Sequence, residues 1–91
     1  LAHAKNMRAG GKVAHDVGQG GPHARVAAAN IRVKLLGENV AKAANAAAAH
    51  QALWASPSHR QNMLTHSYLY VGIAAVTDKA GDLWVVQVFA R

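Results

Sequence analysis

Residues 83–90 have the sequence LWVVQVFA, and residues 68–76 have the sequence YLYVGIAAV. Both runs are rich in β-branched and aromatic residues, which is typical of strands. The segment between them, TDKAGD at 77–82, is typical of a turn, so the two runs are predicted to form an antiparallel hairpin. Each strand carries apolar side chains on both faces. A sheet of this kind must be covered on both faces, and the chain upstream has to supply the covers.

The sequence upstream of the hairpin contains helix start and stop signals. The predicted helices cover residues 1–9, ended by Gly10 and Gly11; a segment that begins at Pro22; residues 46–55, with Asn45 as N-cap; and a segment from Ser56-Pro57 to Leu64 or Thr65. A brief strand is predicted over residues 31–36, followed by a turn that begins at Gly37. The predicted fold is therefore α+β, a three-layer α-β-α sandwich around a small antiparallel sheet.

Composition narrows the class of protein. The chain has 91 residues, enough for one domain, with 52% hydrophobic and 15% charged residues, which argues against disorder. No apolar run reaches the roughly 18 residues of a membrane-spanning helix, so no transmembrane segment is predicted. The net charge is +6, but its basic residues are scattered, so specific nucleic-acid binding is not predicted. The absence of cysteine excludes disulfides, but it does not distinguish an intracellular from an extracellular protein.

Three polar residues stand out as candidates for a functional site: His15, Glu38 and His59. Two imidazoles and one carboxylate are sufficient for a divalent-metal site or for acid–base chemistry. Taken singly, each is explained more simply as an exposed surface residue. The sequence has no His-Glu-x-x-His motif and no Gly-x-Ser-x-Gly motif, and Ser56 and Ser58 are better explained as helix caps than as nucleophiles.

Several segments occur in a characteristic order: His15, GENV at 37–40, WASPSHRQNML at 54–64, VGI at 71–73 and WVVQVF at 84–89. This order resembles the CAP superfamily of cysteine-rich secretory proteins, antigen 5 and pathogenesis-related proteins, and above all its bacterial SCP-like extracellular domains. The resemblance covers nearly the whole chain. It implies an α-β-α sandwich with a central cleft lined by two histidines and acidic residues, which by position are His15, Glu38 and His59.

The resemblance also implies a secreted or cell-surface protein and a single CAP domain over residues 1–91 that lacks part of its first helix. Many eukaryotic members carry a second Glu shortly after the Trp, where this chain has Ser56 and Pro57. That difference weakens an inherited acid–base mechanism. Members of the family are associated with divalent metals, sterols or other lipids, and protein partners, so a small ligand, a lipid or a protein is a possible partner here.

Three functions follow from these observations. The leading prediction is a secreted, non-enzymatic binding domain whose His15, Glu38 and His59 hold a divalent cation such as zinc, or a small ligand. The second is a metal-assisted or acid–base hydrolase, peptidase-like, with Glu38 as the base. The third is a structural or interaction domain in which the three side chains only hold the fold together.

Overall fold

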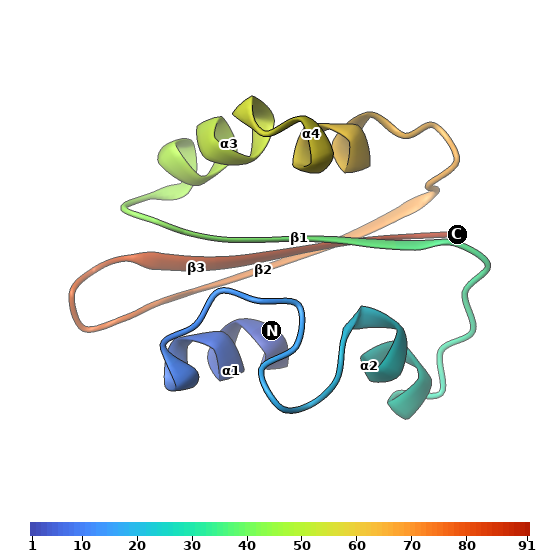
Figure 1. Ribbon diagram of the computed structural model, residues 1–91, viewed down its shortest axis with the longest axis horizontal. Coiled ribbons are helices and arrows are strands. Elements are labelled where there is room, and N and C mark those ends of the chain that lie inside the picture. The colour runs from blue at the N-terminus through green and yellow to red at the C-terminus, as the bar shows by residue number, and fades with distance from the viewer.

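A three-stranded antiparallel sheet forms the middle layer of the computed structural model, which describes residues 1–91 (Figure 1). Two helices cover one face of the sheet and two cover the other. In chain order the elements are α1 (Ala2–Gly10), α2 (Pro22–Ala28), β1 (Leu36–Ala43), α3 (Ala46–Ala55), α4 (Pro57–Leu64), β2 (Tyr70–Thr77) and β3 (Leu83–Ala90). This arrangement confirms the predicted α+β sandwich. None of the helices is both long and apolar enough to cross a lipid bilayer.

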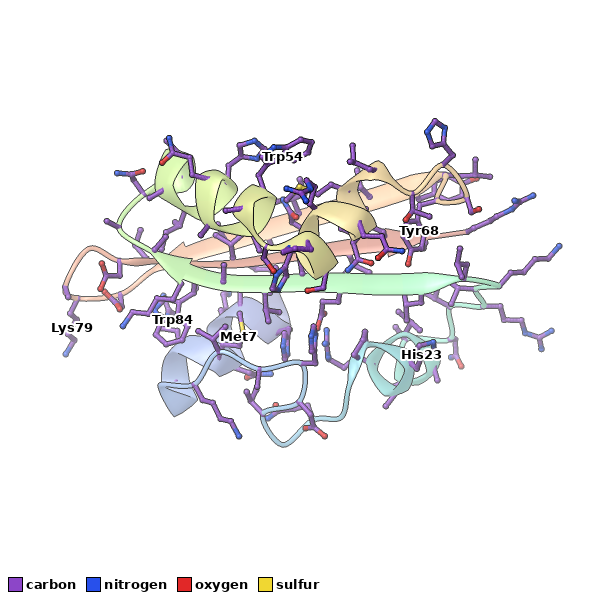
Figure 2. All side chains as sticks on the ribbon, turned by 45° about the horizontal axis from the view of Figure 1, so that its top comes forward. Met7, His23, Trp54, Tyr68, Lys79 and Trp84 are labelled. Carbon is purple, nitrogen blue, oxygen red and sulfur yellow. The ribbon has the colours of Figure 1, made fainter.

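The predicted hairpin is present, and β3 is the central strand of the sheet. It pairs with β2 on one side and with β1 on the other, so the strand order is β1-β3-β2. Trp84 and Val86 of β3 pack with Met7 of α1 and Val40 of β1 to form the main buried cluster. Figure 2 shows Met7 and Trp84 together on the face of the sheet that α1 covers. The long apolar side chains of β3 therefore fix where α1 lies.

Helix ends follow the predicted signals with one exception. Gly11 ends α1 in the left-handed conformation, with φ of 65°, which a residue with a Cβ adopts at a cost. The Asn45 side chain accepts a hydrogen bond of 2.8 Å from the backbone N–H of Ala48, as expected of an N-cap. Ser56 occupies the N-cap position of α4 but makes no capping bond, because its hydroxyl binds the ring of His59 instead.

The strand predicted over residues 31–36 is wrong. The first strand begins at Leu36 and continues through the predicted turn to Ala43, paired with β3 along its whole length. The expectation failed because Glu38 and Asn39 are polar, which is unusual for a buried strand. Both are buried here because other side chains satisfy them, as described below. Residues 31–35 lie outside the sheet.

Gly37 lies in an extended strand and not in a turn. A Cβ at this position would collide with the hydroxyl of Tyr68 and approach Asn62 Oδ1 to 3.2 Å. Glycine is therefore required for close packing: it leaves room for the side chains of Tyr68 and Asn62 against β1.

The prediction that the hairpin is covered on both faces holds for β3 but not for β2. Trp84, Val85 and Val86 of β3 are buried, whereas Val71 and Ile73 of β2 are exposed. These two residues pair with Phe89 and Gln87 of β3 and share their face of the sheet. Because α3 and α4 lie over β1 and the middle of the sheet, the edge strand β2 has no helix over this face, while α1 contacts its other face.

Candidate functional site

Glu38 and Asn39 are consecutive residues of the edge strand β1 and are both buried. Successive side chains of a strand point to opposite faces of the sheet. Glu38 accordingly contacts the layer that contains α1 and α2, whereas Asn39 contacts α4. The candidate site is thus built around the outer edge of β1. Glu38 attaches the layer of α1 and α2 to this strand, and Asn39 attaches the layer of α3 and α4.

The Glu38 carboxylate is held by an arginine and a histidine. Arg25 Nη2 of α2 lies 2.7 Å from each carboxylate oxygen, and His15 Nδ1 lies 3.0 Å from Oε1. The Glu38 side chain is 0% exposed, and a buried carboxylate without a paired cation would be strongly unfavourable. Arg25 supplies that cation, since a guanidinium stays charged in proteins, and its single nitrogen Nη2 approaches both oxygens.

The connection between α1 and α2 is shaped so that His15 reaches Glu38. Asp16 Oδ1 accepts hydrogen bonds from the backbone N–H of Gly18, at 2.8 Å, and of Gly20, at 3.2 Å. The Gly18 bond, followed by the Gly20 bond, lowers the pKa of Asp16 below its ordinary value. Arg25 also donates to the carbonyls of His15 and Gly20, at 3.0 and 3.2 Å. The same arginine therefore fixes the loop and neutralises the carboxylate that the loop approaches.

On the other face of β1, Asn39 joins the strand to α4. Its Nδ2 donates to the carbonyl of His59 at 3.0 Å and to Gln87 Oε1 at 3.1 Å. Its Oδ1 accepts from Asn62 Nδ2 at 2.9 Å, and Asn62 also donates to the Glu38 carbonyl at 3.3 Å. The buried amide is therefore satisfied through both ends, as buried polar groups generally are.

The structure brings two of the three predicted site residues together. His15 and Glu38 are in direct contact, whereas His59 makes no hydrogen bond or ion pair with either. The His59 ring binds Ser56 Oγ through Nδ1 at 2.8 Å, and only its backbone carbonyl belongs to the Asn39 network. No three His, Cys, Asp or Glu side chains lie close enough together to hold a metal ion.

The hydrogen bonds decide which atoms remain available for a ligand. An ionised carboxylate only accepts, so His15 Nδ1 carries the proton in its bond to Glu38. Nε2 of His15 makes no hydrogen bond, and the side chain is 54% exposed. Nε2 of His59 is likewise uncommitted. Each of the two imidazoles therefore has a ring nitrogen free for a ligand, whereas the Glu38 oxygens are 0% exposed and are already held by Arg25 and His15.

Two residues of this cluster were missed by the sequence prediction. No local signal distinguishes Arg25 from the other lysines and arginines, because its partner Glu38 lies 13 residues away in the sequence. His3, which is not among the predicted site residues, is buried on α1 together with Ala4 and Met7. Its Nε2 donates to the Ala14 carbonyl at 2.8 Å and lies 3.9 Å from Glu38 Oε1. The i, i+4 spacing of His3 and Met7 on one helix face was the available sign of burial.

Comparison with known proteins agrees with the fold. None of the curated proteins compared matches the chain. The structure is similar, with a TM-score of 0.86 and 29% sequence identity, to the crystal structure of an extracellular protein containing an SCP domain from Bacillus anthracis str. Ames. That match covers 100% of this chain and 30% of the Bacillus protein. The model of the cysteine-rich secretory protein family, CAP, matches residues 1–89 and confirms the predicted resemblance. The chain therefore belongs to the CAP family.

Proposed function

We propose that this chain is a non-enzymatic binding domain of an extracellular protein, and that it binds a divalent cation such as zinc through His15 and His59. Membership of the CAP family and the likeness to an extracellular SCP-domain protein support the location. One observation carries the binding role: Glu38 accepts a hydrogen bond from His15 Nδ1 and leaves Nε2 of that ring open. In this proposal Glu38 is not itself a metal ligand; it orients the ligand His15 by accepting the hydrogen bond from Nδ1.

This role of Glu38 follows from the usual chemistry of metal-bound histidine. Such a histidine almost always donates its other ring N–H to a carboxylate or carbonyl, which fixes the tautomer and the ring orientation. Glu38 meets this requirement, because Arg25 and the burial of the carboxylate hold it in place. A bound cation would supply positive charge and open coordination positions for a further ligand.

His59 can be the second ligand because of its relation to β1. His15 and His59 belong to opposite helical layers, yet each is attached to β1, through Glu38 and Asn39 respectively. Since β1 is an edge strand, only its outer edge separates the two layers at this point. Nε2 of each ring is uncommitted, so a cation shared by the two rings would bridge the two layers around that edge.

The contacts of the candidate base argue against a hydrolase. The Glu38 side chain is 0% exposed and is held by Arg25 and His15, so its oxygens are shielded from a water molecule whose proton they would have to take. Ser56 and His59 form a hydroxyl–imidazole pair, but no third group orients the ring, as nucleophilic catalysis generally requires. The arrangement is therefore better suited to binding than to catalysis.

Calorimetric titration with zinc tests the proposal. His15→Ala and His59→Ala should each abolish the binding heat, and Glu38→Gln should weaken affinity by about 10- to 100-fold. His23→Ala, an exposed histidine on α2, is the matched control and should bind as the wild type does. The absence of heat with the intact protein, or equal heat for the His15 and His23 variants, would refute cation binding at this site.

The ion pair between the part-buried Arg25 and the fully buried Glu38 carboxylate favours a second role, in which the cluster holds α2 and the preceding loop onto β1. If this is the only role, zinc will not change the melting temperature of the wild type. If the cation also binds, the melting temperature will rise with zinc concentration, because a ligand that binds only the folded state stabilises it. The two roles are thus separated by one thermal measurement with and without zinc.

A further inference from the structure

One end of the sheet gathers three segments that are far apart in the sequence. The chain enters β1 and β2 at this end and leaves β3 there, because both strands run antiparallel to β3. The Leu69 N–H donates to the Ala90 carbonyl at 3.0 Å, and the Arg91 N–H donates to the Leu35 carbonyl at 2.9 Å. Figure 1 shows the C-terminus at this end, beside the start of β1.

Three cations meet at this end of the sheet. Arg32, Lys34 and Arg91 line an open cavity of about 420 Å³ together with Val33, Leu69 and Tyr70. None of the three cationic side chains forms a salt bridge or a hydrogen bond within the protein.

The acidic residues of the chain lie elsewhere or are already engaged. Glu38 is buried against Arg25, and Asp16 is bonded to its own loop. Asp78 and Asp82 belong to the turn between β2 and β3, at the other end of the sheet. Figure 2 shows this separation: Lys79, in the same turn, lies at the opposite end of the molecule from Tyr68. The three cations therefore keep an uncompensated positive field, which attracts an anionic partner.

The same end exposes large apolar side chains between its cations. Tyr70 is 71% exposed and Leu69 is 65% exposed, and Ile31 and Leu35 are exposed in the segment that carries Arg32 and Lys34. Exposed apolar side chains grouped in this way generally mark an interaction surface. A soluble polyanion would account for the cations and would leave these apolar groups in water.

We propose that this basic–apolar end, defined as residues 31–35, 69–70 and 91, docks onto a membrane that contains anionic lipids. Lipid phosphates would pair with Arg32, Lys34 and Arg91, while Leu69 and Tyr70 enter the boundary between headgroups and acyl chains. Tyrosine is favoured at such boundaries because its ring is apolar and its hydroxyl is polar. An anionic lipid surface is the partner chemistry that uses both halves of this surface.

Vesicle flotation of the full chain tests the proposal. The protein should float with phosphatidylcholine vesicles that contain phosphatidylglycerol and should not float with phosphatidylcholine alone. Arg32→Gln/Lys34→Gln should reduce partitioning by about 25-fold, since each cation near an anionic surface contributes about fivefold. Lys5→Gln/Lys79→Gln removes the same charge from exposed positions elsewhere and should reduce partitioning much less.

The apolar half needs its own variant and a soluble control. Leu69→Ser/Tyr70→Ser should lower vesicle binding by about tenfold or more while leaving binding to dextran sulfate, a soluble polyanion, unchanged. If this variant binds vesicles as the wild type does, the site takes soluble polyanions and the membrane proposal is refuted. Binding to uncharged vesicles as strong as binding to anionic ones would also refute it. So would an equal loss of vesicle binding for Arg32→Gln/Lys34→Gln and for Lys5→Gln/Lys79→Gln. Both Leu69 and Tyr70 are exposed, and a circular dichroism melt checks that the variants remain folded.

Discussion

Nη2 of Arg25 lies 2.7 Å from both carboxylate oxygens of Glu38, inside a cluster where the glutamate side chain is completely buried. This contact joins α2 to the edge strand and places His15 against the same carboxylate. Removal of one member of a buried ion pair leaves an uncompensated charge in the interior, which destabilises the fold more than the pair itself stabilises it.

We therefore expect Arg25→Met to lower the free energy of unfolding by about 3–5 kcal/mol, measured by urea denaturation. Glu38→Gln removes the charge that Arg25 compensates, so the double variant Arg25→Met/Glu38→Gln should be less destabilised than the sum of the two single variants. Additive effects would contradict the ion pair as the reason for the arrangement.

Gly37 and Gly72 form a matched pair of strand glycines. A Cβ at Gly37 would collide with the Tyr68 hydroxyl, whereas nothing lies within 4 Å of a Cβ at Gly72. Gly37→Ala should therefore cost about 1–3 kcal/mol and Gly72→Ala should be neutral or slightly stabilising, by thermal or urea denaturation. Tyr68→Phe should restore part of the stability of Gly37→Ala. Equal costs at the two glycines would contradict the close packing.

The β2–β3 turn predicts an acid dependence of stability. The hydrogen bond from Trp84 Nε1 to Asp78 is the largest of the contacts that lower the pKa of Asp78 below 3.8. Because the folded pKa is the lower one, the carboxylate contributes stability above the unfolded pKa, and that contribution is lost as pH falls through the folded pKa. The melting temperature should fall on acidification below about pH 4. Asp78→Asn should show a smaller fall over the same range; an identical acid profile would contradict this assignment.

The two helix starts that look alike in sequence should respond differently to substitution. Asn45 caps α3 with its side chain, so Asn45→Ala should cost about 1 kcal/mol in the free energy of unfolding. Ser56 makes no capping bond to α4, so Ser56→Ala should cost less and should instead release the ring of His59. A larger loss of stability for Ser56→Ala than for Asn45→Ala would show that Ser56 caps the helix in solution.

The sequence predicted the parts of the fold that depend on local chemistry. The run LWVVQVFA at Leu83–Ala90 and the helix start at Pro57 were found at their observed positions, because apolar patterning and proline act over a few residues. The strand Leu36–Ala43 was displaced, because Glu38 and Asn39 are buried only through partners distant in sequence. Arg25 was missed for the same reason.

The exposure of β2 was also outside the reach of local patterns. Tyr70–Thr77 has the composition of a buried strand, yet one side of it has no helix above it. Where α3 and α4 come to lie depends on the Asn39 network, which ties α4 to the opposite edge of the sheet. The composition of a strand predicts that helices should cover it, but only the tertiary contacts determine which strands the helices cover.

In the proposed site, Glu38 holds the His15 ring with Nδ1 protonated and Nε2 open for a cation. Nitrogen-15 NMR of the histidine side chains, recorded with and without zinc, tests it directly. We expect that Nδ1 of His15 carries the proton in the zinc-free protein and that zinc shifts the Nε2 resonances of His15 and His59 but not those of His23. A His15 ring protonated at Nε2 alone, or Nε2 resonances of His15 and His59 that zinc leaves unchanged, would contradict it.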